Sequence, residues 1–114
     1  MKILVIDRDV LMCRTLVRIL GAEGHDALTA PDSARGIALF YREQPEVVIA
    51  EGGETILAIR RVGPSIKIIA ITAHDADMLE TVRLIGAADA IEKPFRTHEL
   101  VERVRAVCRA PTTN

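Results

Sequence analysis

Short apolar runs and longer stretches with helical periodicity alternate along the whole of the 114-residue chain. The apolar runs predict five strands, at 3–6, 26–30, 47–51, 66–71 and 90–92. Between them, apolar residues recur at three- and four-residue spacing, which predicts helices after Asp9, after Asp32, between the glycine pair 52–53 and Gly63, from Asp75 or Asp77, and from about 97 to 109. Strict alternation of strands and helices is typical of an α/β fold, in which helices cover both faces of a parallel sheet as a three-layer sandwich.

Side chains with useful chemistry stand where the predicted strands end. In chain order they are Asp7, Arg8 and Asp9 after the first strand, Glu51 at the end of the third, Thr72 after the fourth and Lys93 after the fifth. In an open parallel sheet a functional crevice forms at the carboxyl ends of the strands. We therefore expect these side chains to lie together in one pocket.

Composition narrows the class of protein. The length predicts one domain, with 49% apolar and 27% charged residues, and the net charge of −1 gives no electrostatic case for binding nucleic acid or a membrane. Cys13 and Cys108 are isolated from each other and from histidine, which favours reduced core thiols in a cytoplasmic protein. Arg60 and Arg61 are interpreted as part of a solvated helix face.

Several short motifs occur together in a recognisable order. They are the stretches 3–7, 45–51, 71–73, 86–89 and 93–95. With these motifs the chain resembles the receiver domain of bacterial two-component response regulators over essentially its whole length. The resemblance implies a flavodoxin-like (βα)5 fold with strand order 2-1-3-4-5, a receiver domain at 1–109 and a flexible tail at 110–114.

The resemblance also implies roles for the strand-end residues. In the family, two acids after the first strand hold Mg²⁺, and an aspartate after the third strand accepts a phosphoryl group from a phosphohistidine. A hydroxyl after the fourth strand and a lysine after the fifth bind the phosphoryl oxygens. Asp7, Thr72 and Lys93 match the first acid, the hydroxyl and the lysine, and Lys93-Pro94 matches the family's cis-proline.

Four positions depart from the family's pattern. Glu51 replaces the aspartate nucleophile, and its extra methylene moves the carboxylate by about 1 Å, a displacement that costs on the order of 10²-fold where positioning decides the rate. Arg8 occupies the position of the family's second acid. The acids Asp7 and Glu51 are then balanced by the basic residues Arg8 and Lys93, so the net charge of the pocket is zero before any metal binds. The connection after Glu51 is also shorter than the family's, and Ala90 replaces the usual aromatic switch residue.

These departures predict a degenerate receiver, or pseudo-receiver, that signals by phosphorylation-independent protein–protein interaction and is not an enzyme. We expect no cofactor and weak or absent Mg²⁺ binding, with Asp7 and Asp9 as the ligands if any metal binds. We also expect Arg8 to pair with Glu51, Asp7 or both.

The expected partners are proteins, such as a histidine kinase, an output domain, another signalling protein or a second copy of the chain. A permanently available partner surface is expected at Met78, Leu79, Glu92, Phe95, His98 and Arg103.

Two other functions stay open at this point. One is a conventional phosphoacceptor that uses a displaced acid, with Asp9 as metal ligand. The other is a small phosphatase of the haloacid dehalogenase type, because the stretch from Asp7 to Val10 also reads as that family's DxD motif. Against the phosphatase, Glu92 is the only acid in the stretch 91–93, where those enzymes need an acidic pair.

Overall fold

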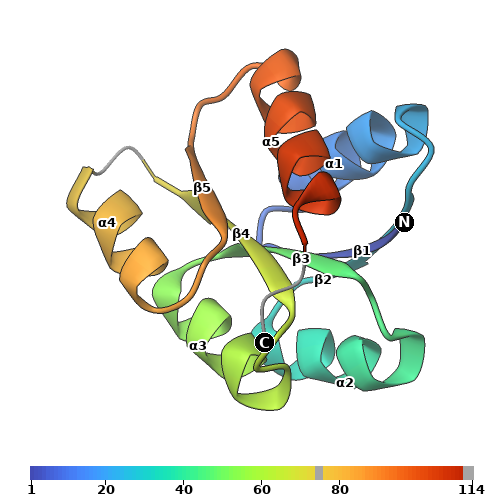
Figure 1. The fold of residues 1–114 in the computed structure, drawn as a ribbon. Coiled ribbons are helices and arrows are strands. Elements are labelled where there is room, and N and C mark those ends of the chain that lie inside the picture. The colour runs from blue at the N-terminus through green and yellow to red at the C-terminus, as the bar shows by residue number, and fades with distance from the viewer. Residues whose placement is uncertain (74–75, 112–114) are drawn as a thin grey trace.

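The computed structural model describes residues 1–73 and 76–111 (Figure 1). The strands are β1 (Lys2–Ile6), β2 (Asp26–Ala30), β3 (Val47–Glu51), β4 (Lys67–Thr72) and β5 (Asp89–Glu92). The helices are α1 (Val10–Ala22), α2 (Ser33–Glu43), α3 (Gly53–Val62), α4 (Ala76–Leu84) and α5 (Thr97–Arg109). The predicted alternation is confirmed, and the bounds of β1, β4 and β5 differ from the prediction by one residue. Asp75, one of the two predicted starts of α4, and residues 112–114 of the predicted tail lie outside the described residues.

All five strands are parallel, and their order in the sheet is β2-β1-β3-β4-β5. The predicted flavodoxin-like fold is therefore confirmed. The register places Glu51 beside Ile71, and Thr72 beside Glu92. This alignment brings the ends of β3, β4 and β5 to the same edge of the sheet, which is what a shared site requires.

Two hydrophobic clusters fill the spaces between the sheet and its helices. Alternate strand residues serve opposite faces, so Ile3 and Val5 pack with α1 and α5, whereas Leu4 and Ile6 pack with α2, α3 and α4. Figure 1 shows the same division, with α1 and α5 together on one side of the sheet. Because both faces are covered, the central strands are almost continuously apolar.

Cationic side chains close the amino end of the sheet. Arg60 donates through Nη1 to the carbonyl oxygens of Gly63, Pro64 and Ile66, and through Nη2 to that of Gly86. Lys67 donates to the carbonyl oxygens of Val107 and Ala110 at the end of α5. These carbonyl groups lie at or just beyond the carboxyl ends of helices, where a positive charge is favourable. The interpretation of Arg60 as a solvated residue is wrong, because the terminal nitrogens of its guanidinium join two loops of the fold.

No helix in the described part of the chain is long and apolar enough to span a bilayer.

Candidate functional site

Asp7 is the buried centre of the predicted pocket. Its side chain is only 1% exposed, directly after the last residue of β1. Oδ1 accepts the backbone N–H of Asp9 at 2.8 Å, and Oδ2 lies 3.1 Å from Lys93 Nζ. A buried carboxylate needs such donors to remain ionised, and Asp7 has one for each oxygen.

Glu51 reaches the same pocket from the end of β3. Its Oε2 lies 3.3 Å from Lys93 Nζ, and its side chain is 39% exposed. Gly52 alone connects Glu51 to α3, and its φ of 88° lies in the left-handed region that glycine adopts without strain. The short connection noticed in the sequence therefore exists, and it places the start of α3 directly beside Glu51.

Lys93 joins the two carboxylates. It follows β5, its backbone N–H donates to the carbonyl oxygen of Thr72 at 2.8 Å, and its peptide bond to Pro94 is cis, as predicted. This backbone bond ties the lysine to the end of β4. Its side chain is 22% exposed, and its ammonium group contacts both Asp7 and Glu51.

The three groups shift one another's pKa values. The neighbouring Asp7 carboxyl and partial burial both raise the pKa of Glu51. Burial acts to raise the pKa of Asp7, but the hydrogen bonds from Glu51, the Asp9 N–H and Lys93 outweigh it and leave that pKa below its usual value. For Lys93, burial is outweighed by the two carboxylates, which raise its pKa. At neutral pH the lysine is therefore charged, and of the two carboxyl groups Glu51 is the one that takes up a proton first.

Arg8 does not form the predicted ion pair. Its side chain is exposed, and it makes no ion pair with any residue of 1–73 or 76–111. The cause is local: the bond from the Asp9 N–H to the Asp7 side chain closes a turn of the Asx type, with Arg8 at its apex. Arg8 still lines a cavity of about 310 Å³ together with Asp7 and Glu51. Lys93, and not Arg8, supplies the positive charge that both carboxylates contact.

Asp9 has a structural task. Its Oδ1 accepts the backbone N–H groups of Leu11 and Met12, at 3.0 and 3.2 Å, and so caps the start of α1. Few oxygen atoms near the pocket are therefore free to bind a divalent cation. Asp7 is bonded through both oxygens, Asp9 caps a helix, and Arg8 occupies the position where the family has a second acid. Among the described residues, no three histidine, cysteine, aspartate or glutamate side chains are grouped so that they could hold a metal ion.

Thr72 lies at the end of β4 and is 2% exposed. Its Oγ1 is buried and makes no hydrogen bond with the part of the chain that the structure describes. The carboxylate of Glu51 thus contacts Lys93 but forms no hydrogen bond with the hydroxyl group of Thr72.

Cys13 contacts the backbone of Asp7, a contact that the sequence interpretation missed. Its Sγ donates to the backbone carbonyl oxygen of Asp7 at 3.3 Å, and burial raises the pKa of the thiol. The helical spacing of Cys13 predicted only a core position, which it also occupies.

The predicted switch position, Ala90, is buried on β5. Its backbone N–H donates to Asp89 Oδ1 at 2.8 Å, and its carbonyl oxygen accepts from Arg103 Nη1 at 3.1 Å. Arg103 also pairs with Asp89 at 2.7 Å. The side chains of Asp89 and Arg103 therefore form hydrogen bonds with the backbone of Ala90 at the edge of the sheet, where another strand would otherwise pair.

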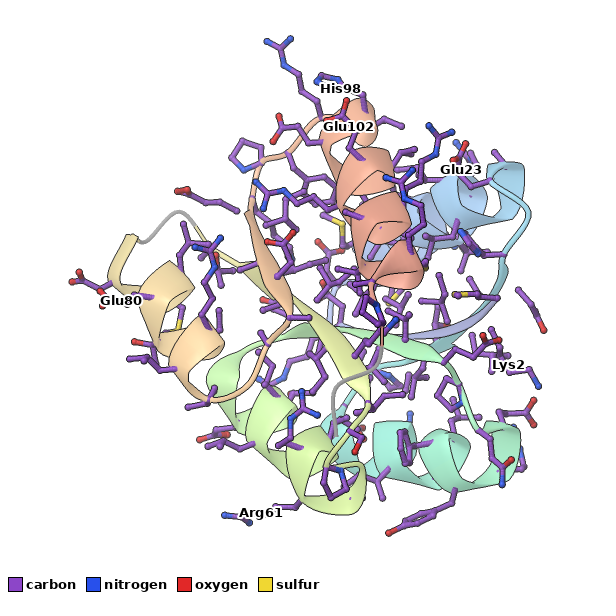
Figure 2. The ribbon with its side chains drawn as sticks, viewed as in Figure 1. Lys2, Glu23, Arg61, Glu80, His98 and Glu102 are labelled. Carbon is purple, nitrogen blue, oxygen red and sulfur yellow. The ribbon has the colours of Figure 1, made fainter. Side chains whose placement is uncertain are left out.

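The predicted partner surface is only partly open. Met78 and His98 are exposed, and Figure 2 shows His98 near the start of α5, at the outside of the molecule. Phe95 packs against the core, and Arg103 is held by Asp89. Leu79, Glu92 and Arg103 line a groove of about 420 Å³ with Ala90.

Comparison with known proteins agrees with this geometry. The family model of the response regulator receiver domain matches residues 3–105. The chain is 28% identical to the sensory transduction protein RegX3 of Mycolicibacterium smegmatis, an alignment that covers 99% of this chain and 53% of RegX3. The receiver domain of NtrX from Brucella abortus superposes with a TM-score of 0.90 at 25% identity, covering 96% of this chain and 99% of that one. A receiver domain protein from Clostridium thermocellum gives a TM-score of 0.85 at 26% identity, over 93% and 92% of the two chains.

The chain therefore belongs to the response regulator receiver domain family. It spans about half the length of RegX3 and about a quarter of a longer NtrX chain to which it is also similar. Receiver domains of this family are signalling modules that interact with histidine kinases and output domains. The family match and the strand order support this class over the haloacid dehalogenase phosphatases.

Proposed function

We propose that this receiver domain binds protein partners without control by phosphorylation. The observation that carries the proposal is the ammonium of Lys93, which lies 3.1 Å from Asp7 and 3.3 Å from Glu51. In the family the lysine contacts the transferred phosphoryl group. Here the lysine contacts two carboxylates of the chain itself.

The charges of the pocket support the same conclusion. Phosphoryl transfer to a carboxylate depends on positioning and on a metal ion that neutralises the developing charge. Glu51 carries its carboxylate one methylene further out than aspartate, so it is a poorly placed acceptor. With Asp7 bonded through both oxygens and Arg8 beside the pocket, we propose that Mg²⁺ binding is weak or absent and that the module has no catalytic turnover of its own.

The proposed state is a single dominant conformation. A modification shifts a conformational equilibrium only by interacting differently with the two states. Here Ala90 provides no ring to move, and the Thr72 hydroxyl has no bond to Glu51 that could report on the pocket. Both cysteines are free thiols, which fits the cytoplasm as the proposed location.

A conventional phosphoacceptor is the second candidate. The buried Thr72 hydroxyl favours it, because an unpaired buried hydroxyl is costly and a phosphoryl oxygen would satisfy it. Against it, the displaced acid that such a mechanism would recruit, Asp9, already caps α1.

The test is partner affinity measured with and without acetyl phosphate and Mg²⁺, beside calorimetric titration with Mg²⁺ alone. We expect an unchanged affinity and no heat of specific binding in wild type. A variant with Glu51→Asp and Arg8→Asp restores the family's acids and is the matched positive control. A wild-type affinity that rises severalfold with the phosphodonor contradicts the proposal.

A further inference from the structure

A cavity of about 660 Å³ lies at the amino ends of β4 and β5. Its walls are the loop between α3 and β4, the loop between α4 and β5, and the last turns of α5. Asp7, Arg8 and Glu51 line a different pocket, at the carboxyl ends of the strands. The volume is typical of a small-molecule site, and binding there does not depend on the proposed function.

Two cations line the cavity without a carboxylate to balance them. Neither Arg60 nor Lys67 forms an ion pair within 1–73 or 76–111, and the acceptors of both are backbone carbonyl oxygens. The carboxyl ends of α3, α4 and α5 each contribute about −0.5 charge, which two full positive charges exceed. Burial lowers the pKa of Arg60, as expected for a guanidinium with no carboxylate beside it. The walls of the cavity therefore carry a surplus of positive charge.

Both cations also have hydrogen-bond donors to spare. A guanidinium has five N–H groups and an ammonium has three. Arg60 Nη2 has one acceptor, the carbonyl oxygen of Gly86, and the buried Nε has none in the part of the chain that the structure describes. Lys67 Nζ has two acceptors, on Val107 and Ala110. Each cation thus retains an N–H group without an acceptor among the described residues.

The acidic residue of the cavity wall, Asp89, does not supply the missing charge. Its Oδ1 lies 2.7 Å from Arg103 Nη1 and 3.6 Å from Arg83 Nη2. Two arginines already exceed the single charge of this carboxylate. An anion that balances Arg60 and Lys67 must therefore come from outside the described chain.

The rest of the wall is largely apolar. Pro64, Ile66, Ala88 and Val107 border the same cavity as the two cations. A small inorganic ion would leave these side chains in contact with water, and a hydrocarbon would leave the spare N–H groups without an acceptor. The ligand that matches both features has an anionic head and an apolar body.

We propose that this cavity binds a small organic acid, whose carboxylate accepts hydrogen bonds from Arg60 and Lys67 and whose apolar body lies against Ile66 and Val107. The site is separate from the strand-end pocket and needs neither a phosphoryl group nor a metal ion.

Isothermal titration calorimetry with sodium octanoate tests the proposal. Octanol and acetate are the matched probes, since octanol lacks the charge and acetate lacks most of the apolar body. We expect saturable one-to-one binding of octanoate, about fivefold or more tighter than that of either probe. No saturable binding of octanoate, or an equal affinity for octanol or acetate, overturns the proposal.

Charge variants test the two cations. Arg60→Gln and Lys67→Gln should each weaken octanoate binding by about fivefold, the effect of losing one charge-assisted contact beside solvent. Arg61→Gln removes the same charge from the next position of α3, and Figure 2 shows Arg61 directed away from that helix. This control should keep the wild-type affinity. Arg60 also joins two loops, so Lys67→Gln decides the matter if Arg60→Gln does not fold, and an unchanged affinity in Lys67→Gln contradicts the proposal.

Amide resonances of the wild-type chain locate the site. In a two-dimensional NMR spectrum, octanoate should shift the amides of Ser65, Gly86 and Val107 and leave those of Arg8 and Gly52 unchanged. Shifts centred on Arg8 and Gly52 would place the anion in the pocket of Lys93 and would refute the assignment to this cavity.

Discussion

Replacement of Lys93 by methionine removes the cation that both carboxylates of the pocket contact. Asp7 is then left 1% exposed with one oxygen unpaired, beside the carboxyl of Glu51. Breaking a fully buried pair by deleting one partner costs roughly 3–5 kcal/mol. Lys93 is 22% exposed and Glu51 39% exposed, and solvent screens them, so we expect a loss of about 2–3 kcal/mol. At about 4 °C per kcal/mol for a domain of this size, the melting temperature should fall by roughly 8–12 °C.

The loss of stability in the Lys93→Met variant should depend on pH. Without the lysine, the closely placed carboxyl groups of Asp7 and Glu51 retain a proton more strongly in the folded state than in the unfolded state. A folded-state pKa that is raised contributes stability below the unfolded pKa and loses it as the pH rises through the folded pKa. The Lys93→Met variant should therefore be closest to wild type near pH 4 and furthest from it near pH 7.

Urea unfolding followed by circular dichroism at pH 4, 5, 6 and 7 measures these differences. Adding Glu51→Gln to Lys93→Met should recover about 1 kcal/mol at pH 7, because the amide can donate to Asp7 and the repulsion is gone. Arg61→Met, at an exposed position of α3, is the control and should change stability by less than about 0.5 kcal/mol. A Lys93→Met variant as stable as wild type at pH 7, or a loss independent of pH, would refute this account of the pocket.

Three further outcomes follow from the structure. The Glu51→Gln variant should gain stability relative to wild type as the pH rises above 4.5, the ordinary pKa of glutamate, because the pKa of Glu51 is raised in the folded state. Denaturation curves of both proteins, measured in parallel at several pH values, check this. Gly36→Ala should cost about 1–3 kcal/mol of stability, since a Cβ there would lie 2.5 Å from Ile6 Cδ1. Thermal melts should show the contrast with Gly21→Ala, whose Cβ would meet nothing within 4 Å and which should stabilise the protein by about 0.5 kcal/mol. Asp9→Ala should cost about 1 kcal/mol through loss of the α1 cap, seen as faster hydrogen exchange in the first turn of that helix.

The sequence pattern was sufficient for the fold and for bringing the strand-end side chains to one end of the sheet. Fully covered parallel strands read as apolar runs, and their ends are forced to one edge, so Asp7, Glu51, Thr72 and Lys93 could be grouped before any coordinates. The roles of Asp9 as a helix cap and of Lys93-Pro94 as a cis bond were also predictable from residue type and position.

The pairing of charges within the pocket was not predictable in the same way. Arg8 and Lys93 have the same charge in the sequence, and which one reaches the carboxylates depends on the local backbone. The turn closed by Asp7 and Asp9 directs Arg8 outward, while the bond from the Lys93 N–H to Thr72 holds the lysine at the end of β4. The cavity at the amino ends of β4 and β5 escaped notice for a related reason, since residue type gives the charges of Arg60 and Lys67 but not the carbonyl groups that the fold brings to them.

Intact-mass spectrometry of the chain incubated with acetyl phosphate and Mg²⁺ tests the central claim most directly. The account predicts that wild type keeps its mass, while the variant with Glu51→Asp and Arg8→Asp gains one phosphoryl group under the same conditions. A stoichiometric gain of one phosphoryl group by wild type, located on Glu51 or a neighbouring acid, would contradict the account.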